Sequence, residues 1–190
     1  MNALVGRTRD DDPLMLVISR AAKDPNVDVD KLERLLLMAE RVQNRQAEAD
    51  FYADLSAMQR DLPSINEMGQ IKDKSGRVQS TYAHWEDIND VIKPIMQQHG
   101  FALSFRTTAA VPPSKRMLIA GILSHRGGHR TETEMSLPPD ESGNKNEVQA
   151  IGSAISYGQR YCAKALLNIT SRLDIDNDGG TQKRSPAVAA

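Results

Sequence analysis

The chain lacks the long apolar segments of a membrane protein and the cysteine pairs of a secreted one. Its longest apolar runs, such as "LMLVI", are far shorter than the roughly 20 residues that cross a bilayer. Three aspartates precede this run, which argues against a secretory signal. The single cysteine, Cys162, allows no internal disulfide and fits a reducing compartment. We therefore expect a cytoplasmic protein that makes no membrane contact.

Complete motifs for nucleotide or metal chemistry are also missing. There is no G-x-x-x-x-G-K-[ST] loop, so ATP-driven activity is not expected. The carboxylates of "PDESGNK" lie in a predicted loop, and His125 and His129 have no further Cys or His cluster for zinc. The segment "DIDNDGG" begins like a calcium loop, but Ser185 takes the place of the bidentate glutamate. We expect no catalytic residue, no metal site and no required cofactor.

Acidic residues are scarce in two regions of a chain whose net charge is only −1. Residues 64–131 hold 9 basic and 5 acidic residues, a net charge of +4. From 148 to 173 there is no Asp or Glu, while Arg160, Lys164 and Arg172 are present. Two acid-poor regions favour one face that binds an anion, with chance clustering as the alternative.

Hydrophobic periodicity predicts an α+β fold. A short helix over 14–22 is followed by a long helix over about 29–62, which Pro63 ends and which packs on the core or on another subunit. The next predicted elements are a β-hairpin over 65–72 and 77–83, a helix from Trp85 to His99 that Pro94 kinks or interrupts, a three-stranded antiparallel meander over 101–108, 117–125 and 129–137, and a C-terminal helix over 145–167 packed on that sheet.

Composition divides the chain into three parts. We expect a polar arm with a short helix over 1–28, a core domain over 29–170, and an acidic linker with a disordered tail over 171–190.

The helix predicted over 145–167 contains Gly152 and Gly158, although glycine costs about 1 kcal/mol relative to alanine in a helix interior. On a wheel of about 100° per residue, one arc of roughly 160° is apolar. That arc holds Ala150, Ile151, Ala154, Ile155, Gly158, Tyr161, Cys162, Ala165 and Leu166. Small residues four apart within it predict close packing against a sheet or a neighbour.

The opposite arc of the same helix has no acidic residue. It holds Lys145, Gln149, Gly152, Ser153, Ser156, Tyr157, Arg160 and Lys164. A solvated helix face usually mixes Glu with Lys, whereas this set suits phosphate oxygens and leaves room for a sugar–phosphate backbone. The alternative is a polar face that lacks Glu by chance.

Basic residues flank the predicted hairpin and aromatic residues follow it. These residues are Lys72, Lys74, Arg77, Tyr82 and Trp85. Cations that follow a backbone, together with rings on which bases stack, suit single-stranded nucleic acid. Tyr82 and Trp85 as ordinary core residues are the alternative. Arg126 and Arg130, beside a "GG" turn, add further positive charge.

Two segments carry a family resemblance. "GRVQSTYAHWEDINDVIKPIMQQHGFALSF" and "LPPDESGNKNEVQAIGSAISYGQRYCAKALLNI" resemble the Erf family of phage single-strand annealing proteins, over residues 49–180. The most specific part is "GSAISYGQRY" after "KNEVQAI". The resemblance implies an ATP-independent recombinase that coats single-stranded DNA as a ring or a helical filament. It also implies an annealing-protein fold, with a groove between a β-hairpin and a helix-backed sheet.

From the residues and this resemblance we expect a non-enzymatic protein that binds single-stranded DNA and anneals complementary strands. Magnesium would act only through the DNA, and a partner exonuclease or a host single-strand binding protein would complete the pathway. The alternatives are a phage structural or assembly protein and a metal-dependent recombination nuclease. Only ten residues follow Gly180, whereas longer family members continue well past this core.

Overall fold

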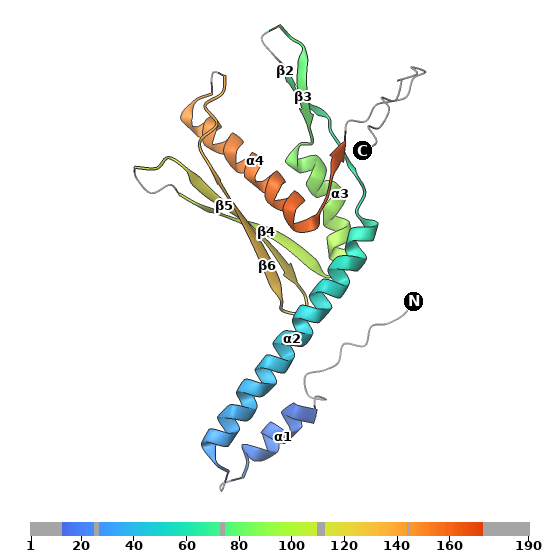
Figure 1. The fold of residues 1–190 in the computed structure, drawn as a ribbon, viewed down its shortest axis with the longest axis vertical. Coiled ribbons are helices and arrows are strands. Elements are labelled where there is room, and N and C mark those ends of the chain that lie inside the picture. Colours follow the sequence, from blue (N-terminus) through green and yellow to red (C-terminus); the bar gives the residue numbers. More distant parts are fainter. Residues whose placement is uncertain (1–12, 25–26, 73–74, 110–112, 144, 173–190) are drawn as a thin grey trace, which may run out of the picture.

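The computed structural model describes residues 13–24, 27–72, 75–109, 113–143 and 145–172 (Figure 1). The polar arm expected over 1–12, Lys74, and the acidic tail expected over 173–190 lie outside the described residues. The elements in chain order are α1 (Pro13–Ala21), α2 (Val29–Asp61), β1 (Ile65–Asn66), β2 (Gly69–Lys72), β3 (Val78–Tyr82), α3 (Trp85–Gln98), β4 (Phe101–Thr108), β5 (Met117–His125), β6 (Arg130–Leu137), α4 (Glu147–Leu167) and β7 (Ser171–Arg172). The predicted α+β class and the order of its main elements are confirmed.

The first predicted strand is divided in the structure. Only β2 pairs with β3, in an antiparallel hairpin whose register joins Gly69 to Tyr82. β1 pairs instead with β7 in parallel, and the Ile65 N–H donates to the Thr170 carbonyl oxygen (3.0 Å). The prediction of one strand over 65–72 was wrong because the partner of β1 lies about a hundred residues further along the chain.

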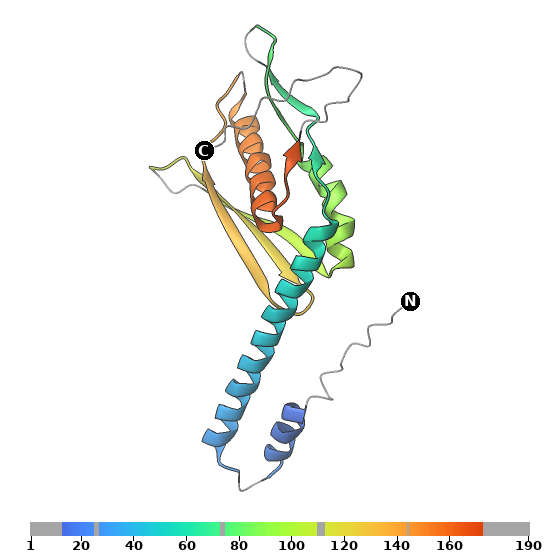
Figure 2. The ribbon, with the colours of Figure 1, turned by 45° about the vertical axis from the view of Figure 1, so that its right-hand side comes forward.

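Helix α4 packs along a sheet with the order β4-β5-β6 (Figures 1 and 2). The predicted line of small residues, Ala150, Ala154, Gly158 and Cys162, is buried. A Cβ atom on Gly158 would lie 2.9 Å from the Ile119 Cβ of β5, so glycine is what allows the helix to approach the strand. Burial raises the pKa of the Cys162 thiol, as fits a core residue.

The helical wheel predicted the buried face of α4 wrongly near its C-terminal end. Tyr161 and Ala165, predicted on the apolar arc, are exposed. The buried face instead includes Ala163 and Leu167, and Leu167 belongs to the same hydrophobic cluster as Ile88 and Ile92 of α3. The buried side of α4 therefore turns along the helix: it lies within the predicted arc from Ala150 to Cys162 and outside that arc at Ala163 and Leu167.

Helix α3 runs through Pro94 without a break. Its buried residues Ile88, Ile92 and Met96 lie on one face, so Pro94 falls on the outer side of the helix. Proline has no N–H, so Pro94 cannot donate the usual helical hydrogen bond to the Asp90 carbonyl. Asp90 is exposed, so water can replace that hydrogen bond. The predicted interruption of this helix is therefore wrong. Gly100, at φ +77°, directly follows the C-cap residue His99.

Helix α2 joins the core only through its C-terminal half. Phe51 and Met58 are fully buried there. The Gly127 N–H donates to Nδ1 of the buried His125 (3.2 Å), so Nε2 carries the proton and donates to Asp54 (3.0 Å). The N-terminal half extends beyond the core, and among the described elements α1 packs on it (Figures 1 and 2). Among the described residues, no helix is both long enough and apolar enough to cross a membrane.

The two glycines of α4 give a matched test of this packing. Gly152→Ala should raise the free energy of unfolding by up to about 1 kcal/mol, because nothing lies within 4 Å of the added Cβ. Gly158→Ala makes the same change in helix propensity, yet it should lower that free energy by about 1–3 kcal/mol through overpacking on Ile119. Urea unfolding measures both. Equal effects of the two substitutions would show that α4 does not rest on β5 in this way.

Candidate functional site

A cleft of about 890 Å³ lies between the polar face of α4 and the junction of β3 with α3. Eight residues predicted from the sequence line it: Tyr82, Trp85, Lys145, Ser153, Ser156, Tyr157, Arg160 and Lys164. Trp85 is half-buried and its ring meets Phe105 edge-on, so it belongs to both the core and the cleft. The fold therefore brings one helix face and the end of one hairpin strand together.

Aromatic rings and cations alternate along this cleft. The Arg160 guanidinium lies over the Tyr82 ring (4.6 Å) and within 5.5 Å of the Tyr157 ring centre. Tyr157 stacks on Tyr161 (4.3 Å between ring centres), and the Lys164 ammonium lies 5.8 Å from the Tyr161 ring. Tyr157 and Tyr161 are four residues apart on α4, which places them on the same side of the helix. They are 40% and 41% exposed, so flat aromatic surface faces the solvent.

Arg160 holds the two walls of the cleft together. Its Nη1 donates a hydrogen bond to the backbone carbonyl of Ala83 (3.0 Å), at the start of α3. Its Nε is buried, and within the described part of the chain it has no hydrogen-bond partner. An unsatisfied buried donor costs about 1–3 kcal/mol, which marks this position as one where an acceptor would be favourable.

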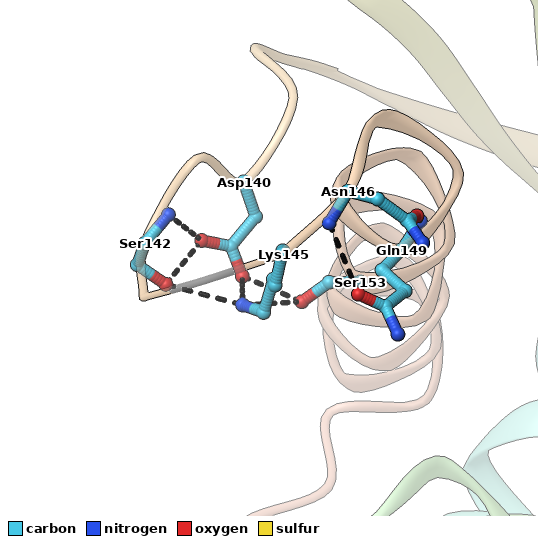
Figure 3. Close-up of polar contacts among 6 residues, drawn as sticks. All are labelled: Asp140, Ser142, Lys145, Asn146, Gln149 and Ser153. Atoms are coloured by element: carbon cyan, nitrogen blue, oxygen red, sulfur yellow. Dashed lines mark hydrogen bonds and ion pairs between the residues drawn. The ribbon is translucent and has the colours of Figure 1, made fainter.

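Asp140 gathers the polar groups at the start of α4 (Figure 3). Its carboxylate accepts hydrogen bonds from the ammonium of Lys145 and from the hydroxyls of Ser142 and Ser153 (both 2.5 Å). These contacts, that of Lys145 first, hold the pKa of Asp140 well below its usual range. Lys145 and Ser153 are therefore already engaged with a carboxylate that stays ionised.

A second carboxylate lies near the other end of the helix face. Glu67 accepts hydrogen bonds from Ser171 and from Thr81 (both 2.5 Å), and Lys164 donates to Ser171 (2.5 Å). The hydrogen bond from Ser171, followed by that from Thr81, lowers the pKa of Glu67. The contact with Tyr161, followed by partial burial, raises the pKa of Tyr157, so this phenol stays neutral beside an anion.

The low acid content of two regions of the sequence does not make the cleft free of acids. The polar arc of α4 has no acid, but Glu67, Glu86 and Asp140 reach the cleft from other elements. They face the three cations Lys145, Arg160 and Lys164 and balance them in formal charge. Helical periodicity cannot reveal this balance, because the acids lie outside the helix. The cleft therefore offers an anion a few directed donors rather than a strongly positive field.

A model of the ERF superfamily matches residues 51–188. The chain belongs to the ERF superfamily. No curated protein and no solved structure matches it. The family match includes the cleft and leaves out the whole N-terminal half of α2.

Among the described side chains of this ERF superfamily chain, four further predicted residues, Arg77, Arg126, Arg130 and Gln149, do not line the cleft. Gln149 lies in the capping box of α4, where its side chain accepts from the Asn146 N–H (3.0 Å) and its own N–H donates to Asn146 (2.9 Å; Figure 3). Lys72 ends β2 and Arg77 precedes β3, at the end of the hairpin away from Tyr82.

Arg126 and Arg130 lie at the opposite end of the meander from the β4–β5 turn. Arg126 rests on Gly100 and pairs with Asp54 (3.3 Å). Arg130 begins β6 and is exposed. Within the described part of the chain, no group of three His, Cys, Asp or Glu residues is placed to hold a metal ion.

Several cleft residues were not predicted from the sequence. Tyr161 was assigned to the apolar arc, although its spacing of four from Tyr157 is the signal of a stacked pair. His84 lies next to Tyr82 in the cleft (5.0 Å between ring centres). It belongs to the "YAHWED" segment but was not predicted as a contact residue. Glu67, Thr81, Asp140 and Ser142 gave no local signal, because each joins the cleft only through tertiary contact.

The low pKa of Asp140 predicts a pH-dependent contribution to stability. Near neutral pH, Asp140→Asn should lower the free energy of unfolding by about 1–2 kcal/mol, since hydrogen bonds to a charged acceptor are lost. Because the folded-state pKa is depressed, this stabilisation is complete above the unfolded pKa of about 4 and declines as the pH falls toward the folded pKa.

Denaturant unfolding of both proteins between pH 7 and pH 3 measures this difference. Glu141→Gln is the control, because that neighbouring carboxylate is exposed and makes no hydrogen bond within the described residues. A difference between wild type and Asp140→Asn that stays constant with pH would contradict the role given to this carboxylate.

Proposed function

We propose that this protein binds single-stranded DNA in the α3–α4 cleft and anneals complementary strands without ATP, in homologous recombination of the phage type. Membership of the ERF superfamily supports the annealing function. The main structural support for DNA binding in this cleft is its high content of aromatic residues. Three of the four tyrosines of the chain and its one tryptophan line this cleft.

Stacking favours single strands over duplexes. The faces of Tyr157 and Tyr161 are partly open to solvent, and the bases of a single strand can lie against such faces. Each base–aromatic stack contributes about 1–3 kcal/mol and shows little sequence preference. A protein that pairs any two complementary strands requires this tolerance. The bases of an intact duplex are stacked on one another and cannot reach the rings.

The cations of the cleft would bind the phosphates. Arg160 lies between two rings, and its buried Nε has no hydrogen-bond partner among the described residues, so it is the cation best placed for a phosphate or base acceptor. Lys145 donates to Asp140, and Lys164 donates to Ser171, which in turn donates to Glu67. A phosphate would compete with these contacts for the two ammonium groups. Binding should therefore weaken as salt rises, by about 0.7 in log K per log[salt] for each contact.

Annealing also needs more than one copy of the chain. A single cleft of about 890 Å³ holds only a few nucleotides, too few to keep two strands in register. We propose a ring or a helical filament of many copies along the strand, with an exonuclease or a host single-strand binding protein as further partners. No cofactor is required in this proposal, and magnesium acts only through the DNA.

The direct test mixes the protein with complementary labelled oligonucleotides without ATP, with and without magnesium. Faster pairing of intact strands in both conditions is the expected result. Cleavage that requires magnesium would indicate a nuclease in the same pathway. Absence of binding to single strands would indicate a structural or assembly protein, and it would end this proposal.

Paired variants test the location of the site. Tyr157→Ala combined with Tyr161→Ala should weaken binding to a short oligonucleotide by roughly 5- to 150-fold, because one base stack is lost. Tyr52→Ala removes the one tyrosine outside the cleft and should change binding little. Fluorescence anisotropy at a fixed salt concentration measures both. An equal loss in the two variants would place the DNA elsewhere.

The salt dependence gives an independent reading. Lys164→Ala should reduce the slope of log K against log[salt] by about 0.7, because one phosphate contact is lost. Lys93→Ala, at an exposed position of α3 that does not line the cleft, should leave the slope unchanged. A wild-type affinity that did not vary with salt would contradict phosphate binding by these cations.

A further inference from the structure

We infer that the N-terminal half of α2, residues 29–48, is an arm through which copies of this chain assemble head to tail, with the basic flank of one arm against the acidic flank of the next. The inference deepens the proposed function, which requires many copies but does not say how they meet. The evidence for this assembly surface is the exposure of the arm and the pattern of its charges.

Helix α1 covers only the middle of the apolar face of the arm. Ala39 is buried beneath it and Leu35 is half-buried. Exposed apolar residues lie on both sides of this covered strip. Met38 (58% exposed) and Val42 (54%) are on one side, and Leu36 (46%) and Val29 (73%) are on the other. A pair of helices that leaves apolar residues exposed along both sides has surface for a further helix on each side.

The charges of the arm are separated by sign around the helix. At about 100° per residue, the acids fall within an arc of roughly 80° on the side of Leu36, and the bases fall within another arc of roughly 80° on the side of Met38. The acidic flank consists of Asp30, Glu33, Glu40 and Glu48, and the basic flank consists of Lys31, Arg34, Arg41 and Arg45.

These side chains are largely free of partners in the monomer. All eight residues are exposed. Within the described part of the chain, only Lys31 forms an ion pair, with Asp28 (3.9 Å). At i,i+3 or i,i+4 spacing, these eight residues form three pairs of like charge (Asp30–Glu33, Lys31–Arg34 and Arg41–Arg45) and only two of opposite charge (Asp30–Arg34 and Arg45–Glu48). Like pairs at this spacing are unfavourable in an isolated helix, so each flank gains from a partner of opposite charge.

A second copy of the chain matches both flanks at once. A nucleic acid or another acidic partner would leave the acidic flank unmatched, and a basic partner would leave the basic flank unmatched. Because α1 already occupies the centre of the apolar face, two arms cannot meet front to front. Contact between unlike flanks is heterologous, so it repeats from copy to copy and gives a ring or a helical filament.

The position of the arm leaves the cleft open. The arm extends from the core at the end opposite to the β2–β3 hairpin, while the cleft lies between α4 and the base of that hairpin (Figures 1 and 2). Copies joined through their arms would therefore not cover Tyr157, Arg160 or Tyr161.

Charge reversal with complementation tests this inference. One variant carries Arg34→Glu, Arg41→Glu and Arg45→Glu, so both of its flanks are acidic. The other carries Glu33→Lys, Glu40→Lys and Glu48→Lys, so both of its flanks are basic. Without DNA, the wild-type protein should sediment as assemblies, and each variant alone should associate on the order of 100-fold more weakly, because like charges meet. An equimolar mixture of the two variants should assemble again.

A third protein that carries all six substitutions keeps opposite flanks with their signs exchanged, and it should assemble by itself. Recovery in the mixture or in this protein cannot come from misfolded chains, and circular dichroism should show unchanged helix content. Binding of a short oligonucleotide should stay within twofold of wild type in every variant, because the cleft is untouched. Failure of the proposed DNA-binding function would therefore appear in that assay and not in sedimentation.

The inference is overturned if the wild-type protein sediments as a monomer without DNA. It is equally overturned if either variant alone assembles like wild type. A mixture of the two variants that stays monomeric would also overturn it.

Discussion

Helix α4 packs closely on strand β5 at Gly158, which has no side chain of its own, and the geometry of the candidate site depends on this contact. The Ile119 side chain fills the space that a Cβ on Gly158 would need. Close approach of the helix keeps its polar face level with Tyr82 and Ala83, so that Arg160 reaches across to both. If α4 were lifted from the sheet, the hydrogen bond of Arg160 to Ala83 would be lost and the two walls of the cleft would separate.

The cleft combines stacking surfaces with cations that are already partly satisfied. Asp140 and Glu67 are held ionised by the hydroxyls and ammonium groups around them, and they keep Lys145 and Lys164 ordered without a ligand. Such pairing lowers the gain from each phosphate contact but fixes the donors in place. If single-stranded DNA binds in this cleft as proposed, its affinity would depend largely on the tyrosine faces, on which bases stack with little sequence preference.

The sequence predicted the features that are periodic or local. The length of α2, the meander and the small-residue line of α4 follow from hydrophobic spacing, and eight of the fourteen predicted contact residues line the cleft. Contacts between distant segments could not be predicted in this way. The β1–β7 pair and the carboxylates of Glu67 and Asp140 depend on tertiary placement. Gln149 fits the phosphate pattern as a residue type, but its place three residues after Asn146 makes it a capping residue.

Photocrosslinking to a single strand tests the central claim most directly. Tyr52 is 54% exposed and lies outside the cleft, whereas Tyr157 and Tyr161, inside it, are less exposed. With an oligonucleotide that carries 5-iodouracil, mass spectrometry should find adducts on Tyr157, Tyr161 and Trp85 and none on Tyr52. Adducts that follow exposure alone, with Tyr52 labelled most strongly, would contradict binding of single-stranded DNA in the α3–α4 cleft.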